Sequence, residues 1–120
     1  MLFYVAGPYT NNGRTTVGDN IANARKAAIS IWENGHYAIC PHLNTAYFDV
    51  DCKLAEDKYL EGCIEILKRC DFAIFIPGWQ YSKGSLIEKE FCENNDIPYH
   101  LLGSWPDAKR WSEILKAISR

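Results

Sequence analysis

The sequence has no excess of basic residues. It contains 13 Lys and Arg residues against 15 Asp and Glu residues, which gives a formal net charge of −2. Proteins that follow the phosphate backbone of a nucleic acid usually carry a strongly positive surface. We therefore expect no nucleic acid polymer as a partner. A small anionic ligand stays possible, because one or two local donors suffice for it.

The sequence also lacks a long hydrophobic run and a basic leader segment. No stretch approaches the roughly 20 apolar residues that a membrane-spanning helix needs. The N-terminal segment MLFYVAGPYT is too short for a signal peptide and has no basic region. These two absences predict a cytoplasmic protein that has no membrane partner.

Cysteine and histidine show no metal-binding spacing. The five cysteines include no CxxC pair, and the three histidines are scattered along the chain. An odd number of cysteines argues against a disulfide framework and favours a reducing compartment. We therefore expect no metal site. The spacings of the GxGxxG and GxxxxGK motifs are absent as well, which excludes the corresponding dinucleotide and phosphate loops.

What the sequence does contain is a regular alternation of strand and helix patterns within 120 residues, the length of one domain. Apolar runs predict strands at 2–6, 36–40, 71–76 and 98–102. Apolar residues at helical spacing predict helices at about 19–34, 54–70, 85–95 and 106–118, the first of them capped by Asp19 or Asn20. This order predicts a single α/β domain over 1–120 of the flavodoxin or Rossmann type, with a parallel sheet and helices on both faces.

The loops that follow the predicted strands mark the expected binding site. In open parallel sheets, ligands bind outside the carboxyl ends of the strands. Those ends carry loops at 7–19, 41–53 and 77–84, and the first two are longer than most loops in such folds. We therefore expect a site to be built from these three segments.

Glu88 is the most informative acidic residue. Helical spacing places it in the apolar sector of its helix, with Phe91 and Cys92, and near the positive N-terminal end. A carboxylate in that position is partly desolvated and suited to chemistry. Ser85 and Glu88 also form the S-x-x-E pattern of a capping box, in which the glutamate has a purely structural role. Spacing alone leaves both interpretations open.

Other side chains near these loops have equally open roles. Strand alternation places Tyr4 with Ala6 on one face, where the Tyr4 hydroxyl either reaches the carboxyl edge or belongs to the core. Trp79 is able to stack on a base or to anchor its loop. Arg14 and Ser82 are able to hold a phosphate or are simply solvated.

Several segments in the same order resemble the nucleoside 2-deoxyribosyltransferase-like family, which includes the related 2′-deoxynucleoside 5′-phosphate N-hydrolases. The segments are FYVAGPYT at 3–10, EGCIEILKRCDFAIFIPGW at 61–79 and SKGSLIEKEF at 82–91. AICPHLNTAYF at 38–48 is similar to the second-strand segment of uncharacterised members from bacteria and phages. The resemblance extends to about residue 102.

The resemblance implies specific roles. A glutamate four residues after the loop glycine attacks C1′ of the sugar in this family, and Gly84 and Glu88 have that spacing. The tyrosine of the first strand, which orients the glutamate, matches Tyr4. Ser82 matches a serine that contacts the 5′-phosphate in the nucleotide hydrolase branch, where the transferases carry an Asp. Cys63 stands where family enzymes carry an Asp that helps to bind the sugar and manage the leaving base.

The sequence therefore predicts a site for a small nucleoside or nucleotide, with Glu88 and Tyr4 as catalytic residues. The candidate substrate-binding residues are Gly7, Pro8, Arg14, His42, Asn44, Cys63, Gly78, Trp79, Ser82 and Gly84. The chemistry implied by the resemblance needs no metal or organic cofactor. The family resemblance also implies a homodimer or higher homo-oligomer.

Three functional hypotheses follow from the sequence. The first is an enzyme that cleaves or transfers across an N-glycosidic bond, with Glu88 as the nucleophile. The second is a non-catalytic nucleotide-binding protein that kept the pocket but lost turnover, for which Cys63 in place of the family Asp is the reason. The third is an interaction module without a small ligand.

Overall fold

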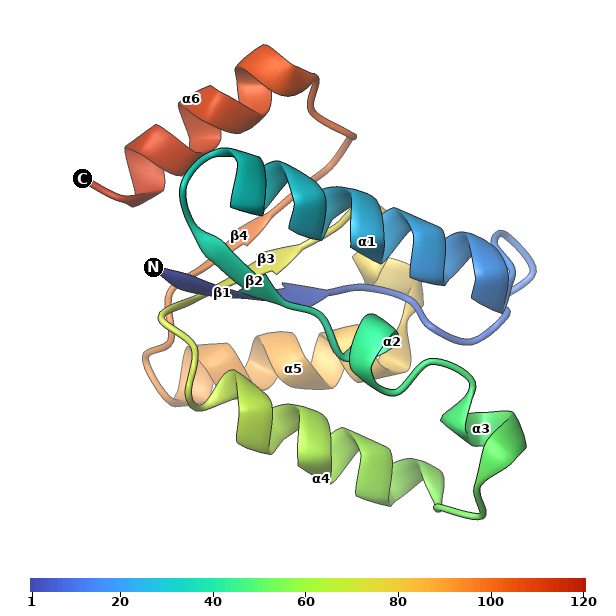
Figure 1. Ribbon diagram of the computed structural model, residues 1–120. Helices are drawn as coiled ribbons and strands as arrows, with labels where there is room; N and C mark the ends of the chain where they lie inside the picture. The colour runs from blue at the N-terminus through green and yellow to red at the C-terminus, as the bar shows by residue number, and fades with distance from the viewer.

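Four short strands form the centre of the molecule in the computed structural model, which describes residues 1–120. They are β1 (Leu2–Ala6), β2 (Tyr37–Ile39), β3 (Phe72–Phe75) and β4 (Tyr99–Leu101). All neighbours are parallel and the order is β2-β1-β3-β4, as Figure 1 shows. The predicted parallel α/β sheet is confirmed.

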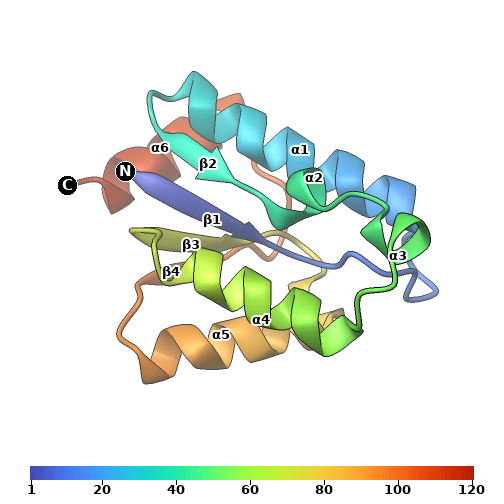
Figure 2. The same ribbon diagram turned by 60° about the horizontal axis from the view of Figure 1, so that its bottom comes forward.

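Four long helices cover the two faces of this sheet. They are α1 (Val17–Glu33), α4 (Glu56–Leu67), α5 (Lys83–Asn94) and α6 (Ala108–Ile118). Helices α1 and α6 pack on one face, and α4 and α5 pack on the other (Figures 1 and 2). None of the helices is both long enough and apolar enough to cross a membrane.

The direction in which successive strands are added reverses between the two central strands, β1 and β3. From β1 the chain continues through α1 to β2 on one side, whereas from β3 it continues through α5 to β4 on the other side. Helices α1 and α5 lie on opposite faces, so the chain runs from β1 and from β3 to opposite faces of the sheet (Figure 2). This is the topological switch point at which open α/β sheets bind ligands.

Strand alternation divides the core into two clusters. Phe3 and Val5 of β1 pack into the cluster beneath α1 and α6, together with Ile31. Tyr4 and Ala6 face the opposite cluster, beneath α4 and α5. The alternation predicted for β1 is therefore confirmed, and it places the Tyr4 side chain on the same face as the helix that carries Glu88.

The connecting segments contain more structure than the sequence predicts. The segment 41–53, expected to be a loop, includes the short helices α2 (Pro41–Asn44) and α3 (Phe48–Asp51). Proline at the first position of α2 has the backbone angle that a helix start needs. A 3-10 turn, η1 (Trp79–Tyr81), precedes α5.

The predicted N-cap of α1 is wrong. Thr16, not Asp19 or Asn20, caps the helix: its hydroxyl accepts from the Asp19 N–H, and the Asp19 carboxylate accepts from the Thr16 N–H. Asn20 is buried instead and holds the loop after β1, because its side-chain amide donates to the Tyr9 and Thr10 carbonyls. The reason is that Thr16 offers a complete capping box.

Candidate functional site

A cavity of about 390 Å³ lies at the carboxyl ends of β1 and β2. Its walls come from β1, the loops after β1 and β2, α4, and the N-terminal turns of α5. The candidate residues that the structure brings together in its walls are Tyr4, Gly7, His42, Cys63, Ser82, Gly84 and Glu88. We call this space the main cavity.

The centre of the main cavity is a buried pair formed by Tyr4 and Glu88. The two side chains are only 1% and 6% exposed. The Tyr4 hydroxyl donates a hydrogen bond to Oε2 of Glu88, which joins the middle of the sheet to α5. Cys63 of α4 lies in the same cavity wall, close enough to Glu88 for the carboxylate charge to affect the pKa of its thiol.

Burial raises the pKa of all three groups. It raises the pKa of Glu88 to about 7, and the hydrogen bond from Tyr4 only partly opposes this rise. Burial, followed by the nearby Glu88 charge, also raises the pKa of the Tyr4 hydroxyl and of the Cys63 thiol. Near neutral pH, therefore, Glu88 is present in both its protonated and its ionised form, whereas Tyr4 and Cys63 stay protonated.

Helix α5 begins at Lys83, two residues earlier than the sequence predicts. Ser82 is the N-cap, and its hydroxyl oxygen accepts from the Ser85 N–H at 3.2 Å. Ser85 is thus already inside the helix, and the Ser85–Glu88 capping box is wrong. The Glu88 carboxylate accepts a hydrogen bond from the Tyr4 hydroxyl and none from the backbone at the helix start. Capping of α5 therefore does not explain why Glu88 is buried in the cavity wall.

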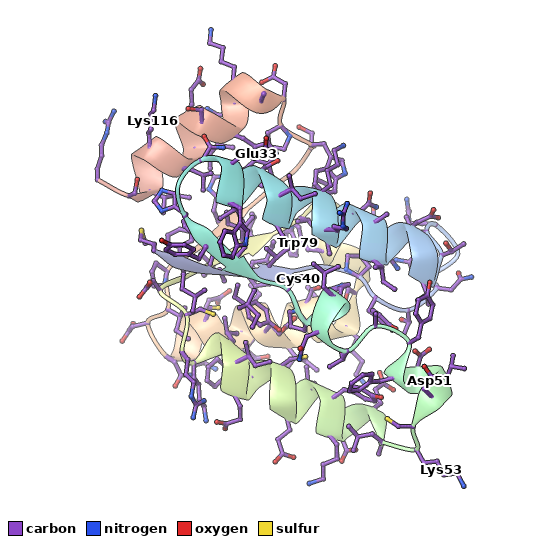
Figure 3. The ribbon with its side chains drawn as sticks, viewed as in Figure 1. Glu33, Cys40, Asp51, Lys53, Trp79 and Lys116 are labelled. Carbon is purple, nitrogen blue, oxygen red and sulfur yellow. The ribbon has the colours of Figure 1, made fainter.

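His42 fixes the loop after β1 through neutral hydrogen bonds. Its Nε2 lies 2.7 Å from the Pro8 carbonyl and 3.1 Å from the Gly7 carbonyl. A carbonyl only accepts, so Nε2 carries the proton and Nδ1 accepts from the Cys40 thiol at 3.4 Å. Cys40 lies at the start of α2 (Figure 3). Burial lowers the pKa of His42, which keeps the ring neutral.

Gly7 allows the loop after β1 to pass close to the Ile76 side chain. A Cβ atom added at Gly7 would overlap the buried Ile76 side chain, with its Cδ1 only 2.7 Å away. Ile76 follows β3 and donates its N–H to the Ala6 carbonyl. Only glycine therefore fits at this position, where the chain leaves β1 beside the main cavity.

A second, smaller cavity of about 190 Å³ lies on the other side of the same loops. It contains the candidate residues Pro8, Arg14 and Gly78. The Arg14 guanidinium stacks over the Tyr81 ring at 3.9 Å from its centroid. The structure thus places these three residues away from Glu88, although they belong to the loops that line the main cavity.

Two candidate residues line neither cavity. Asn44 is exposed at the end of α2. Trp79 packs against Phe75, with ring centroids 6.4 Å apart, and belongs to the core beneath α4 and α5. In this structure, Trp79 anchors the loop after β3.

The main cavity also includes residues that the sequence analysis missed. Among them are two acids, Asp49 of α3 and Glu56 at the start of α4, and the aromatic residues Tyr9 and Tyr59. The Tyr9 hydroxyl donates to Oδ1 of Asp49 at 3.0 Å and so joins the first loop to α3. Asp49 reaches the cavity because the segment 41–53 forms α2 and α3, and no local sequence pattern predicted these two short helices.

The sequence matches a known protein family. The match covers residues 1–99, and the family is described as a domain of unknown function, DUF4406. Because the match covers most of the 120 residues, the chain belongs to the DUF4406 family. A comparison with curated proteins found no match.

The burial of Glu88 predicts a specific pH dependence of stability. Between its ordinary pKa of 4.5 and the folded value of about 7, the folded protein holds a proton that the unfolded chain has released. The free energy of unfolding should therefore fall as pH rises through this window. Glu88→Gln removes that loss, so its stability relative to the unmodified protein should increase by up to about 3 kcal/mol from about pH 5 to about pH 8.

Urea unfolding of both proteins at the two pH values measures this difference. Glu90→Gln is the matched control, because Glu90 is exposed on the same helix. Equal pH dependence in the Glu88→Gln and Glu90→Gln proteins would show that the Glu88 carboxyl is not held in a desolvated state.

Proposed function

We propose that this protein is an enzyme that cleaves, or transfers across, the N-glycosidic bond of a nucleoside or nucleoside 5′-monophosphate. The observation that carries the proposal is the buried Glu88 carboxyl, oriented by Tyr4, in a cavity at the carboxyl edge of a parallel sheet. The ordered resemblance to nucleoside 2-deoxyribosyltransferases supports it, because that resemblance assigns Glu88 and Tyr4 the same two roles.

The proposed reaction has two steps. An ionised Glu88 oxygen attacks C1′ of the sugar, the bond between C1′ and the base nitrogen breaks, and the base leaves with the bonding electrons and gains a proton. Water, or a second base, then attacks C1′ and releases the carboxylate. Because Tyr4 donates to Oε2, it fixes the direction of the carboxyl and leaves the other oxygen for the attack.

The first turn of α5 is the proposed phosphate site. The first amides of a helix have no partner within the helix and favour anions. Gly84 and Lys83 of this turn line the main cavity. The Ser82 hydroxyl accepts from the Ser85 N–H, so its hydrogen remains available to donate to a phosphate oxygen. Asp49 and Glu56 would repel a phosphate placed against α3 and α4.

Release of free base provides the direct test of the nucleophile. We expect the unmodified protein to release base from at least one member of a panel of nucleosides and 5′-monophosphates, detected by chromatography. Its rate should rise with pH toward and above 7, because burial raises the pKa of Glu88 to about 7 and attack needs the ionised form. Glu88→Gln should lower the rate by roughly three orders of magnitude or more.

Glu90→Gln is again the control, and it should keep the full rate, because Glu90 does not line the main cavity. Base release that survives Glu88→Gln would exclude Glu88 as the nucleophile.

The role of Ser82 predicts a preference for nucleotides. A 5′-monophosphate should bind more tightly than its nucleoside in calorimetry. Ser82→Ala should weaken nucleotide binding by roughly 10- to 100-fold, because a hydrogen bond to a charged group is lost, and should leave the nucleoside nearly unchanged.

Ser82 also caps α5, so Ser82→Asp serves as the matched variant. Aspartate keeps the cap but repels a phosphate, and it should weaken nucleotide binding further without loss of the fold. Equal affinities of the unmodified protein for nucleotide and nucleoside would contradict a phosphate site.

Cys63 favours a second candidate function, that of a nucleotide-binding protein without turnover. It lines the main cavity beside Tyr4, at the position where the resemblance implies an Asp. Burial raises the pKa of the thiol, so this side chain stays neutral and is only a weak hydrogen-bond partner. The cavity would then bind a nucleotide while lacking the group that manages the leaving base.

Cys63→Asp distinguishes the enzyme from the binding protein. In an enzyme limited by this position, the new carboxyl should raise base release about 10-fold or more. A second carboxyl beside Glu88 should also move the pH midpoint of the rate upward, because like charges disfavour ionisation. Cys63→Asn is the control of similar shape that supplies no carboxyl. A folded Cys63→Asp protein with no base release, together with an inactive parent, would leave only the binding function.

A further inference from the structure

The hydroxyl of Ser85 is the one buried side-chain oxygen or nitrogen in the protein that has no hydrogen-bond partner. Ser85 is 1% exposed and lies in the wall of the main cavity. A serine inside a helix usually faces water or donates to the carbonyl one turn earlier, and Ser85 does neither. An unsatisfied buried hydroxyl lowers stability, so its position in a cavity wall points to a ligand group.

Ser85 lies between the two parts of the proposed site. It precedes Glu88 by three residues, so both project from the same face of α5. In the opposite direction along the helix, Ser82 and Gly84 form the proposed phosphate site. A ligand that reaches from Ser82 to Glu88 therefore passes Ser85.

The stereochemistry of a nucleotide determines which ligand group that is. The base of a natural nucleotide is on the β face of the sugar, so a nucleophile that displaces it in line must approach C1′ from the α face. The 3′-hydroxyl, and in ribose also the 2′-hydroxyl, project from this α face. The 2′-hydroxyl is on the carbon next to C1′. The 3′-hydroxyl is on the carbon next to C4′, and C4′ carries the C5′ group with the phosphate. Ser85 lies one helical turn from Glu88 in the direction of the phosphate site. If Glu88 faces C1′, the sugar group closest to Ser85 is therefore the 3′-hydroxyl.

We propose that Ser85 is a specificity-determining residue that hydrogen-bonds the 3′-hydroxyl of the sugar, an inference that rests on the proposed function. A serine hydroxyl both donates and accepts, and so does a sugar hydroxyl, so the two groups satisfy each other. The Ser85 side chain has three staggered positions about its Cα–Cβ bond, and the proposed contact requires the position that turns the oxygen toward the cavity. The site then selects nucleotides with a free 3′-hydroxyl over 3′-deoxy analogues.

A double-mutant cycle between Ser85 and the 3′-hydroxyl tests the proposal. Calorimetry on the full-length chain carrying Glu88→Gln, which prevents turnover, would compare 2′-deoxynucleoside 5′-monophosphates with their 2′,3′-dideoxy counterparts. We expect the dideoxy compounds to bind about 10-fold more weakly. With Ser85→Ala added, the two compounds should bind equally. Ser82→Ala should instead weaken both by the same factor, since both carry the phosphate.

Thermal unfolding without ligand gives an independent readout. Ser85→Ala removes an unsatisfied hydroxyl and introduces a better helix former, so its midpoint should be equal to or higher than that of the parent. A lower midpoint would mean that Ser85 has a structural partner within the protein and would overturn the assignment.

The outcomes separate this inference from the function on which it rests. If nucleotides bind but the dideoxy penalty is unchanged in the Ser85→Ala protein, the Ser85 assignment is wrong and the proposed function stands. If Ser85→Ala instead removes a preference between ribonucleotides and 2′-deoxynucleotides, the hydroxyl is at 2′ and the 3′ assignment is overturned. If no nucleotide binds to either protein, both proposals fail.

Discussion

The hydrogen bond between Tyr4 and Glu88 is the interaction on which the rest of the site depends. It replaces only part of the hydration that Glu88 loses, which is why burial still raises the pKa of the carboxyl to about 7. An ionised carboxylate in such an environment is stabilised by any positive charge that develops beside it. In the proposed reaction that charge develops at C1′ of the sugar. The desolvation of Glu88 therefore destabilises the ionised carboxylate in the free protein, and the positive charge at C1′ stabilises it in the transition state.

The surrounding loops are held by neutral side chains that bind backbone carbonyls. Asn20 donates to the carbonyls of Tyr9 and Thr10, and His42 lies within hydrogen-bond distance of the carbonyls of Gly7 and Pro8. Because burial lowers the pKa of His42, its ring stays uncharged beside the cavity. The loop after β1 is thereby held by uncharged groups, and no ion pair lowers the pKa of Glu88.

The sequence predicts those features that depend on local periodicity. Alternation placed Tyr4 and Ala6 on one face of β1, and helical spacing placed Glu88 on the buried side of α5. The cap of α5 was mispredicted because Ser82 and Ser85 are both suitable N-caps, and the turn η1 decides which of them begins the helix. The positions of Arg14 and Asp49 depend on how segments distant in the sequence pack against one another. Local sequence patterns do not predict such packing.

The charges around the main cavity restrict how a nucleotide fits the proposed site. Lys83 and the first turn of α5 attract an anion, whereas Asp49 and Glu56, on α3 and α4, repel one and are able to accept hydrogen bonds from N–H groups of a ligand. A nucleotide has a phosphate at one end and, at the other, a base that carries at least one N–H donor. With the phosphate at Ser82 and the base toward α3 and α4, the sugar is opposite Glu88. The reversed orientation would place the phosphate against two carboxylates, so electrostatic repulsion favours the orientation with the phosphate at Ser82.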